Sequence, residues 1–225
     1  MGIVVAIDGP AGSGKSSTAK EVAKRLGFTY VDTGAMYRAI TLLAIRRKVS
    51  PENSELVVAL ADLIDIQFRW ENGDLRTLLN GEDVSDEIRS AEVAQAVSPV
   101  SAIAGVREIM VKRQREMSRE NNIVMEGRDI GTNVFPKADF KFYVTADVEV
   151  RARRRIGDYQ KIGQNLSWEE IVEEIKKRDR IDSSRTHSPL KKAEDAVIID
   201  TTHLTFEEQV EKIIEIVKNR PEMVR

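Results

Sequence analysis

The most informative segment of this chain is Gly9-Pro10-Ala11-Gly12-Ser13-Gly14-Lys15-Ser16, which fits the pattern G-x-x-x-x-G-K-[ST] in full. A nearly continuous apolar run at 3–8 precedes it and indicates a strand buried on both faces. Residues 17–26 follow it, with apolar positions at helical spacing. Strand, glycine-rich loop and helix together are the context in which this pattern binds phosphate.

The residue types in this loop suit a polyphosphate ligand. Glycines at 9, 12 and 14 let the backbone curl with its N–H groups pointing inward, and they leave room for an anion. The following helix directs its positive dipole end at the same place. Lys15 can reach the β- and γ-phosphates of a nucleoside triphosphate, and the Ser16 hydroxyl can ligate Mg²⁺.

The composition excludes several classes of protein. With 225 residues, 41% of them hydrophobic, the chain can bury a core. The formal net charge is −2, from 35 basic and 37 acidic residues, which argues against a nucleic acid polymer or an anionic membrane as partner. The absence of cysteine excludes disulfides and thiolate metal sites. No signal segment or bilayer-spanning run is expected, so we expect a cytoplasmic protein.

Strand-like and helix-like segments alternate along most of the chain. Strands are expected at 3–8, 28–31, 123–126, 140–144 and 196–200, and helices between them. This order predicts an α/β fold of the P-loop NTPase type, with a five-stranded parallel sheet flanked by helices. Ligands of such sheets lie at the carboxyl ends of the strands, where Asp8, Asp32, the segment 126–129 and Asp200 are expected.

The pattern changes between residues 65 and 87. Apolar and polar residues alternate there, and Asn-Gly pairs at 72–73 and 80–81 signal hairpins, so a small β-rich insertion is predicted. We expect a helix to begin at Pro51, and helical spacing from 90 to 119 to be interrupted at Pro99. The predicted division is a single domain with core segments 1–64, 88–148 and 188–225, the insertion at 65–87 and a helical region at 149–187.

Several further segments resemble bacterial cytidylate kinases. Asp32-Thr33-Gly34-Ala35-Met36-Tyr37-Arg38 is similar to that family's D-[ST]-G-x-x-Y-R segment. Gly127-Arg128-Asp129-Ile130-Gly131-Thr132 and the segment 178–185, Arg-Asp-Arg-Ile-Asp-Ser-Ser-Arg, also match it. The order and spacing agree over nearly the whole chain. Thr33 stands where serine is commoner in the family, and it keeps the hydroxyl.

The resemblance implies a single kinase domain, in which the insertion at 65–87 binds the nucleoside monophosphate and 149–187 forms a helical lid. It implies transfer of a phosphoryl group from ATP to CMP or dCMP, with Mg²⁺, giving CDP or dCDP plus ADP. It implies ATP contacts from the loop residues and one lid arginine: Gly9, Pro10, Ala11, Gly12, Ser13, Gly14, Lys15, Ser16, Ser17 and Arg154. It implies acceptor contacts from Thr33, Arg38, Ser98, Arg107, Arg128, Asp129, Arg178 and Asp182. Lys15, Arg128, Arg178 and Arg185 would act on the reacting phosphates, and Ser16 would bind the metal.

The residue types agree with these roles. Two anionic ends must meet, so arginines should converge, and the bidentate guanidinium groups of Arg38 and Arg128 suit a phosphate. A carboxylate at Asp129 would accept a hydrogen bond from the exocyclic amine of cytosine, which uracil lacks. Purely structural interpretations of these residues stay open. Asp129 could be a turn or cap residue, Asp182 and Arg178 could form an intrahelical ion pair, and Ser98 could cap or break its helix.

The arginine-rich run 151–155 predicts lid side chains that close over ATP, with a solvated helix face as the alternative. Arg151 and Arg155 share one face of a helix, and Arg154 would need the other side.

The sequence leaves three other functions open. The first is a P-loop kinase for a different small acceptor, such as another nucleoside monophosphate or shikimate. The second is a GTPase switch or nucleotide-gated binding module, against which the chain shows neither an Asn-Lys-x-Asp motif nor a D-x-x-G after the second strand. A nucleic-acid-binding protein is disfavoured by the near-zero net charge. We expect a monomer that binds small-molecule nucleotides.

Overall fold

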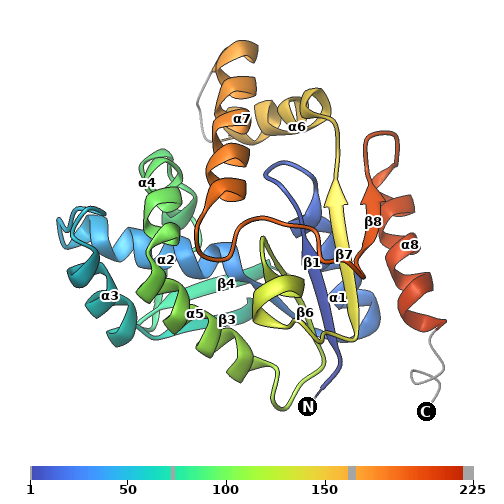
Figure 1. Cartoon of the computed structure of the whole chain (residues 1–225), viewed down its shortest axis with the longest axis horizontal. Coiled ribbons are helices and arrows are strands. Elements are labelled where there is room, and N and C mark those ends of the chain that lie inside the picture. Colours follow the sequence, from blue (N-terminus) through green and yellow to red (C-terminus); the bar gives the residue numbers. More distant parts are fainter. Residues whose placement is uncertain (1, 72–73, 162–165, 220–225) are drawn as a thin grey trace. The chain divides into compact units, whose positions relative to one another are not determined.

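The computed structural model describes residues 2–71, 74–161 and 166–219, and it divides into two compact units (Figure 1). The first unit is Met1–Val31 with Met117–Arg225, and the second is Asp32–Glu116. Within the described residues, none of the helices has the length and apolar character needed to cross a bilayer.

A five-stranded sheet forms the centre of the first unit. Its strand order is β2 (Thr29–Asp32), β6 (Ile123–Gly127), β1 (Val4–Asp8), β7 (Phe140–Thr145), β8 (Val197–Asp200). The β1–β6, β1–β7 and β7–β8 pairs are parallel. Every residue of β1 and β6 is buried, as a strand with both neighbours and both faces covered requires. The predicted α/β fold with a five-stranded parallel sheet flanked by helices is confirmed.

Helices α1 (Lys15–Leu26) and α8 (Phe206–Lys218) pack against each other, and α1 also contacts β1 and β6. Arg25 near the end of α1 joins this pair by donating to Glu207 and Glu211 of α8 at 2.6 Å each. Thr205 caps α8 in a capping box with Glu208, which fixes where this helix begins.

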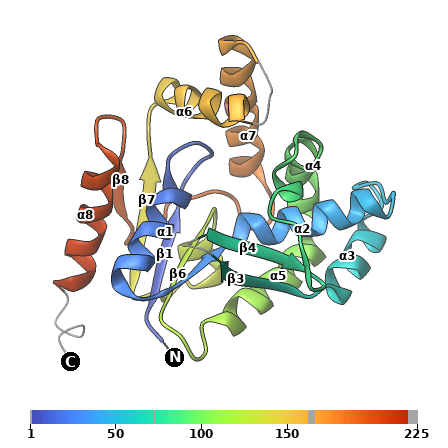
Figure 2. The same cartoon turned by 180° about the vertical axis from the view of Figure 1, so that it is seen from behind.

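Two further helices follow β7 and form a hairpin. In both views α6 (Val148–Lys161) and α7 (Trp168–Ser184) lie together beyond the carboxyl end of β7 (Figures 1 and 2). Ala152 and Tyr159 of α6 pack against Ile171 and Ile175 of α7 in a small apolar core. Ser167 caps α7 in a second capping box, which fixes where that helix begins.

The second unit combines helices with a three-stranded antiparallel sheet. The helices are α2 (Thr33–Arg46), α3 (Ser54–Leu63), α4 (Ala91–Ala102) and α5 (Ala104–Met117), and a short 3₁₀ helix spans Glu87–Arg89. The sheet has the order β3 (Ile66–Glu71), β4 (Asp74–Leu79), β5 (Glu82–Asp83). Asn80 and Gly81 turn β4 into β5 with φ of 52° and 84°, as an Asn-Gly hairpin turn requires. The other Asn-Gly pair, at 72–73, lies outside the described residues.

Two expected helix boundaries in this unit are wrong. Helix α3 begins at Ser54 and not at Pro51, because the Asn53 side chain accepts from the Leu56 N–H and caps the helix there. Proline 99 does not interrupt its helix: α4 continues through it, and the chain turns extended only at Ile103.

The continuation of α4 has a packing explanation. Proline removes one backbone donor and costs helix stability. Val93, Val97 and Val100 lie on one face of α4 and are almost wholly buried. Burying this apolar stripe offsets the missing hydrogen bond, so the helix ends three residues after the proline.

Candidate active site

The loop between β1 and α1 is held in a shape that only glycine allows at two positions. Gly14 occupies the N-cap of α1 in the left-handed conformation, with φ of 88°. A Cβ atom on Gly9 would lie 2.0 Å from the Val144 carbonyl oxygen. Gly14 has no side chain that could cap α1, and the positive end of the helix dipole lies at this loop, which favours an anionic ligand there.

Lys15 and Ser16 open α1 and both meet one buried carboxylate. Lys15 is 6% exposed, and its Nζ donates to the Pro10 carbonyl at 3.3 Å. The same Nζ lies 3.8 Å from Oε2 of Glu126, and the Ser16 hydroxyl donates to Oε1 of Glu126 at 2.7 Å. A lysine, a hydroxyl and a carboxylate therefore converge at the start of α1.

Glu126 is expected from the sequence at the ligand-binding edge of the sheet, but no role is predicted for it there. It lies near the carboxyl end of β6, opposite Ile7 of β1 in the register, and only 3% of it is exposed. The sequence feature that indicates a role for it is an acidic residue near the end of a strand that pairs with the strand before the phosphate loop. The Ser16 hydroxyl and the Glu126 carboxylate are both oxygen donors, the type that Mg²⁺ prefers, so the residues present fit that metal.

Arg151 and Arg154 of α6 both reach this loop. Arg151 Nη1 donates to the Ala11 carbonyl at 3.2 Å, and Arg154 Nη1 donates to the Ser13 carbonyl at 3.1 Å. Arg151 is also paired with Asp179 of α7, with 2.7 Å between Nη1 and Oδ2. These arginines join the helical hairpin to the loop. The alternative that the arginine-rich run is only a solvent-exposed helix face therefore does not hold for Arg151 and Arg154.

Arg151 and Arg155 share one face of α6, as expected, since both pair with carboxylates of α7. Arg155 pairs with Glu174 at 3.6 Å and lies over the Tyr159 ring at 5.1 Å. The expectation that Arg154 needs the other side is wrong, because Arg154 and Arg151 both reach the loop. Residues three apart are neighbours on a helix as much as residues four apart, and the direction of α6 places the loop on that side.

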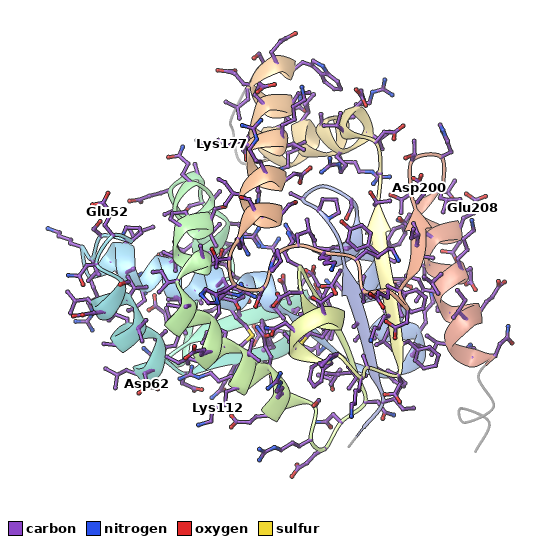
Figure 3. The ribbon with its side chains drawn as sticks, in the orientation of Figure 1. Glu52, Asp62, Lys112, Lys177, Asp200 and Glu208 are labelled. Atoms are coloured by element: carbon purple, nitrogen blue, oxygen red, sulfur yellow. The ribbon has the colours of Figure 1, made fainter. Side chains whose placement is uncertain are left out.

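Thr201 supports the loop from the segment after β8. Its hydroxyl lies 3.0 Å from the carbonyl oxygen of Ser13 and 3.0 Å from that of Thr145. Arg154 Nη2 donates to the Thr201 carbonyl at 2.9 Å. Burial lowers the pKa of the Arg154 guanidinium. Figure 3 labels Asp200, which precedes this threonine at the end of β8.

A second cluster of the first unit joins the segment after β6 to the end of α7. Arg128 Nε donates to Oδ2 of Asp182 at 2.9 Å, and Arg185 Nη2 donates to Oδ1. Asp182 is 2% exposed. Burial opposes its charge, but the charges of Arg128 and Arg185 hold its pKa below the usual value. Burial likewise opposes the charge of Arg128, yet Asp182 outweighs it and raises the pKa of Arg128.

Asp182 has partners beyond an intrahelical ion pair with Arg178. Its carboxylate accepts hydrogen bonds from Arg128 and Arg185, and the charge of Arg178, one turn earlier in α7, also lowers its pKa. The carboxylate therefore organises guanidinium groups from two distant segments. A phosphate that enters this cluster would compete with Asp182 for the same donors.

Asp129 follows Arg128 and is 4% exposed. It precedes a short π-helical turn, Ile130–Val134. Among the residues that the structure describes, the Asp129 side chain forms no capping hydrogen bond with the backbone of that turn. Oδ2 accepts from the Asn133 side chain at 3.2 Å. The alternative of a helix cap is thus not supported, whereas that of a turn residue agrees with the contact to Asn133, and a role toward the acceptor base stays a prediction.

The remaining predicted residues belong to the second unit. Thr33 is buried as the first residue of α2, after Asp32, whose side chain caps the helix by accepting from Ala35 N–H at 2.9 Å. Arg38 is half-buried one turn further on, and Ser98 is half-buried within α4.

Arg107 lies in α5 and is 4% exposed. It donates through Nη1 to the Ser101 carbonyl at 3.1 Å, and its guanidinium carbon lies 5.3 Å from the centre of the Tyr37 ring. An arginine held between a carbonyl and an aromatic ring is fixed in place.

The structure thus assembles the predicted donor residues with Arg128, Asp129, Arg178, Asp182 and Arg185 inside one unit. Thr33, Arg38, Ser98 and Arg107 lie in the other unit. Their convergence with the first set around one acceptor stays a prediction.

Comparison with known proteins agrees over almost the whole chain. The family model for cytidylate kinase matches residues 5–219. The cytidylate kinase of Caldanaerobacter subterraneus subsp. tengcongensis is 53% identical over 216 residues, which cover 96% of this chain and 95% of that protein. The cytidylate kinase of Parabacteroides distasonis is 50% identical over 221 residues, with 95% of each covered.

Among solved structures, an uncharacterized protein from Eubacterium ventriosum matches with a TM-score of 0.54 and 13% identity, covering 97% of this chain and 99% of that one. This likeness concerns the fold alone. The family match, the two relatives and the phosphate loop with its strand and helix lead to one conclusion: the chain belongs to the cytidylate kinase family.

Proposed function

We propose that this protein transfers the γ-phosphoryl group of ATP to the phosphate of CMP or dCMP, giving ADP and CDP or dCDP. The observation that carries the proposal is the pairing of a phosphate-type loop with the Arg128–Asp182–Arg185 cluster at the carboxyl side of one sheet, in a chain of this family. Such a transfer depends on positioning and charge compensation, which these residues supply.

The donor half would use the loop, the start of α1 and α6. Backbone N–H groups of the segment 9–17 would bind the polyphosphate of ATP, with Lys15 at its terminal phosphates. Arg154, which already contacts the loop, would neutralise charge on the donor. Ser16, supported by Glu126, would hold Mg²⁺. When bound, the metal would neutralise charge on the donor phosphates.

The acceptor half would use the arginine cluster and the second unit. Arg38 and Arg128 would bind the acceptor phosphate, and Arg178 and Arg185 would add positive charge as the phosphates approach each other. Asp182 and Thr33 would complete the acceptor contacts. Asp129, with Ser98 and Arg107, would recognise the base. Asp129 as an acceptor distinguishes cytosine, which carries an exocyclic amine, from uracil, which carries a carbonyl.

A coupled assay of ADP formation with ATP and a panel of acceptors tests this function. The panel holds CMP, dCMP, UMP, AMP and shikimate at equal concentration. We expect high kcat/KM on CMP and dCMP, lower on UMP, and least on AMP and shikimate. Equal use of AMP and CMP would overturn the specificity argument, and GTP binding without acceptor-dependent turnover would favour a switch protein.

The variant Asp129→Ala sharpens the same assay. It removes the carboxylate proposed to accept from the cytosine amine, so the ratio of kcat/KM for CMP over UMP should fall. An unchanged ratio with a general loss of activity would mean that Asp129 serves the turn and not the base.

A further inference from the structure

Asp8 is a buried carboxylate that none of the proposed roles uses. It is the last residue of β1 and stands directly before the phosphate loop. Only 4% of it is exposed, and in the sheet it lies opposite Gly127 of β6. A charged group in such a place needs strong partners, because burial alone penalises its ionised form.

Its partners are two backbone N–H groups far away in sequence. Oδ1 accepts from Ile130 N–H at 2.8 Å, and Oδ2 accepts from Gly131 N–H at 2.8 Å. These are the first two amides after Asp129. Hydrogen bonds to an ionised acceptor are stronger than those between neutral groups, so this carboxylate fixes the chain at the point where it leaves the Arg128–Asp129 pair.

The same pair is fixed from its other side. Arg128 is held by Asp182 of α7, and the Asp129 carbonyl accepts the amides of Asn133 and Val134. Asp8 is the contact that ties this segment to the strand from which the phosphate loop begins. Asp8 is thus joined to the phosphate loop, which would contact the donor, through the chain itself. It is joined to the segment after Arg128 and Asp129, which would contact the acceptor, through hydrogen bonds.

We propose that Asp8 is a positioning residue of the phosphoryl transfer: by holding the amides of Ile130 and Gly131, it sets where Arg128 and Asp129 stand relative to the phosphate loop. The proposal rests on the proposed function, since it assumes that Arg128 and Asp129 meet the acceptor. Asp8 itself touches neither substrate.

Burial brings the pKa of the Asp8 carboxyl close to neutral pH. Burial raises the pKa of Asp8 to about 7, against the lowering effect of the two amide hydrogen bonds. The charge of Asp129 raises it further, the charge of Arg128 lowers it, and Tyr143 of β7 is also within electrostatic range. A protonated carboxyl would present an O–H where an N–H needs an acceptor, and would loosen one of the two contacts.

The test compares Asp8→Asn with Asp139→Asn. Asparagine has the shape of aspartate but only one acceptor oxygen, so one of the two amides loses its partner. Asp139 is the matched control, because its Oδ2 accepts from Val4 N–H at 2.8 Å at the opposite end of the same strand. Both variants are assayed in the full chain, with thermal unfolding measured alongside.

For Asp8→Asn we expect KM for CMP to rise about tenfold, the loss of roughly one hydrogen bond to a charged group. KM for ATP should stay within about twofold, and the preference for CMP over UMP should fall, since the phosphate loop keeps its own supports. For Asp139→Asn, neither KM nor the preference should change.

The pH profile adds a readout that a merely structural role would not move. In the parent, kcat/KM for CMP should fall as the pH drops below about 7, beyond the fall caused by protonation of the acceptor phosphate. The Asp8→Asn variant should lack that additional fall, because its amide does not titrate.

Three outcomes would overturn the proposal while the parent still phosphorylates CMP. These are an unchanged KM for CMP, an equal rise of both KM values, or the same pH profile in parent and variant. Failure of the parent itself to use CMP would instead overturn the proposed function. If Asp8→Asn does not fold, Asp8→Ser, which also removes the buried charge and keeps one acceptor, takes its place with the same expectations.

Discussion

The Arg128 guanidinium donates through Nε to the Asp182 carboxylate at 2.9 Å, although 54 residues separate the two in sequence. Because Asp182 is almost wholly buried, the pair lies where solvent screens it little. Each partner stabilises the charged form of the other, and Arg185 completes the arrangement. The end of α7 is thereby joined to the segment after β6.

Replacing Asp182 should therefore destabilise the fold as well as the acceptor site. In Asp182→Ala, two guanidinium groups lose their buried counter-charge, and the free energy of unfolding should fall by about 3 kcal/mol. Urea denaturation followed by circular dichroism measures it. Asp195→Ala is the control: Asp195 pairs with Lys141 at 2.8 Å, but its side chain is 66% exposed, so little change is expected. Equal stability losses in both variants would contradict this account.

Removing the Glu126 carboxylate should weaken the use of magnesium. In Glu126→Gln the Ser16 hydroxyl keeps a partner, but the negative charge beside it is lost. We expect the Mg²⁺ concentration at half-maximal rate to rise about tenfold or more, and kcat to fall, measured by titrating MgCl₂ at saturating ATP and CMP. The control Glu120→Gln removes an exposed carboxylate before the same strand. A parent-like magnesium titration in Glu126→Gln would speak against a role at the metal.

Replacing two neighbouring arginines of α6 one at a time distinguishes the effect of a contact with the phosphate loop from the effect of net charge. Arg154→Ala removes donors to Ser13 and Thr201, whereas Arg153→Ala removes an equal charge from an exposed position. Only the first should raise KM for ATP, by about tenfold, and lower kcat. Steady-state kinetics with ATP varied at saturating CMP gives both constants. If the two variants behave alike, the effect of Arg154 is one of overall charge.

Arg38 should matter for the acceptor and not for the donor. The guanidinium is proposed to bind the acceptor phosphate through paired hydrogen bonds, so Arg38→Ala should raise KM for CMP by about tenfold or more, with KM for ATP little changed. Arg47→Ala, at the exposed end of the same helix, should leave both constants unchanged. A rise in KM for ATP alone would remove Arg38 from the acceptor site.

The buried Asp8 carboxyl predicts how stability depends on pH. Its pKa is raised from 3.8 to about 7 in the folded chain, chiefly by burial. Between these values the folded state binds the proton that the unfolded state has released, so this contribution to stability is present at low pH and is lost as the pH rises toward 7. The difference corresponds to about 4 kcal/mol at most.

This pH dependence is measured as the unfolding free energy of the parent minus that of Asp8→Asn, by urea denaturation at pH 5 and pH 8. The difference should favour the parent more at pH 5 than at pH 8, because only the parent carries the titrating group. A difference that is equal at the two pH values would show that Asp8 does not titrate between them in the folded state.

Local sequence was enough to predict the elements whose cause is local. The phosphate loop needs glycine conformations at Gly9 and Gly14, and the Asn80-Gly81 pair favours one type of hairpin turn. The apolar runs 4–7 in β1 and 123–125 in β6 likewise indicate a buried parallel sheet. The predicted break at Pro99 was wrong, because tertiary packing outweighed the local preference of the sequence. The burial of one face of α4 carried that helix through Pro99, which by itself is a helix breaker.

The site residues divide in the same way. The sequence by itself determined the loop, Lys15 and Ser16, and through family resemblance the identities of the acceptor arginines. Only the tertiary structure decided that Glu126 meets Ser16, that Asp182 is shared by Arg128 and Arg185, and that Asp8 holds the amides of Ile130 and Gly131. The physical reason is that a carboxylate binds whichever donors the packing of strands and helices brings within 3 Å, and that packing depends on the whole chain.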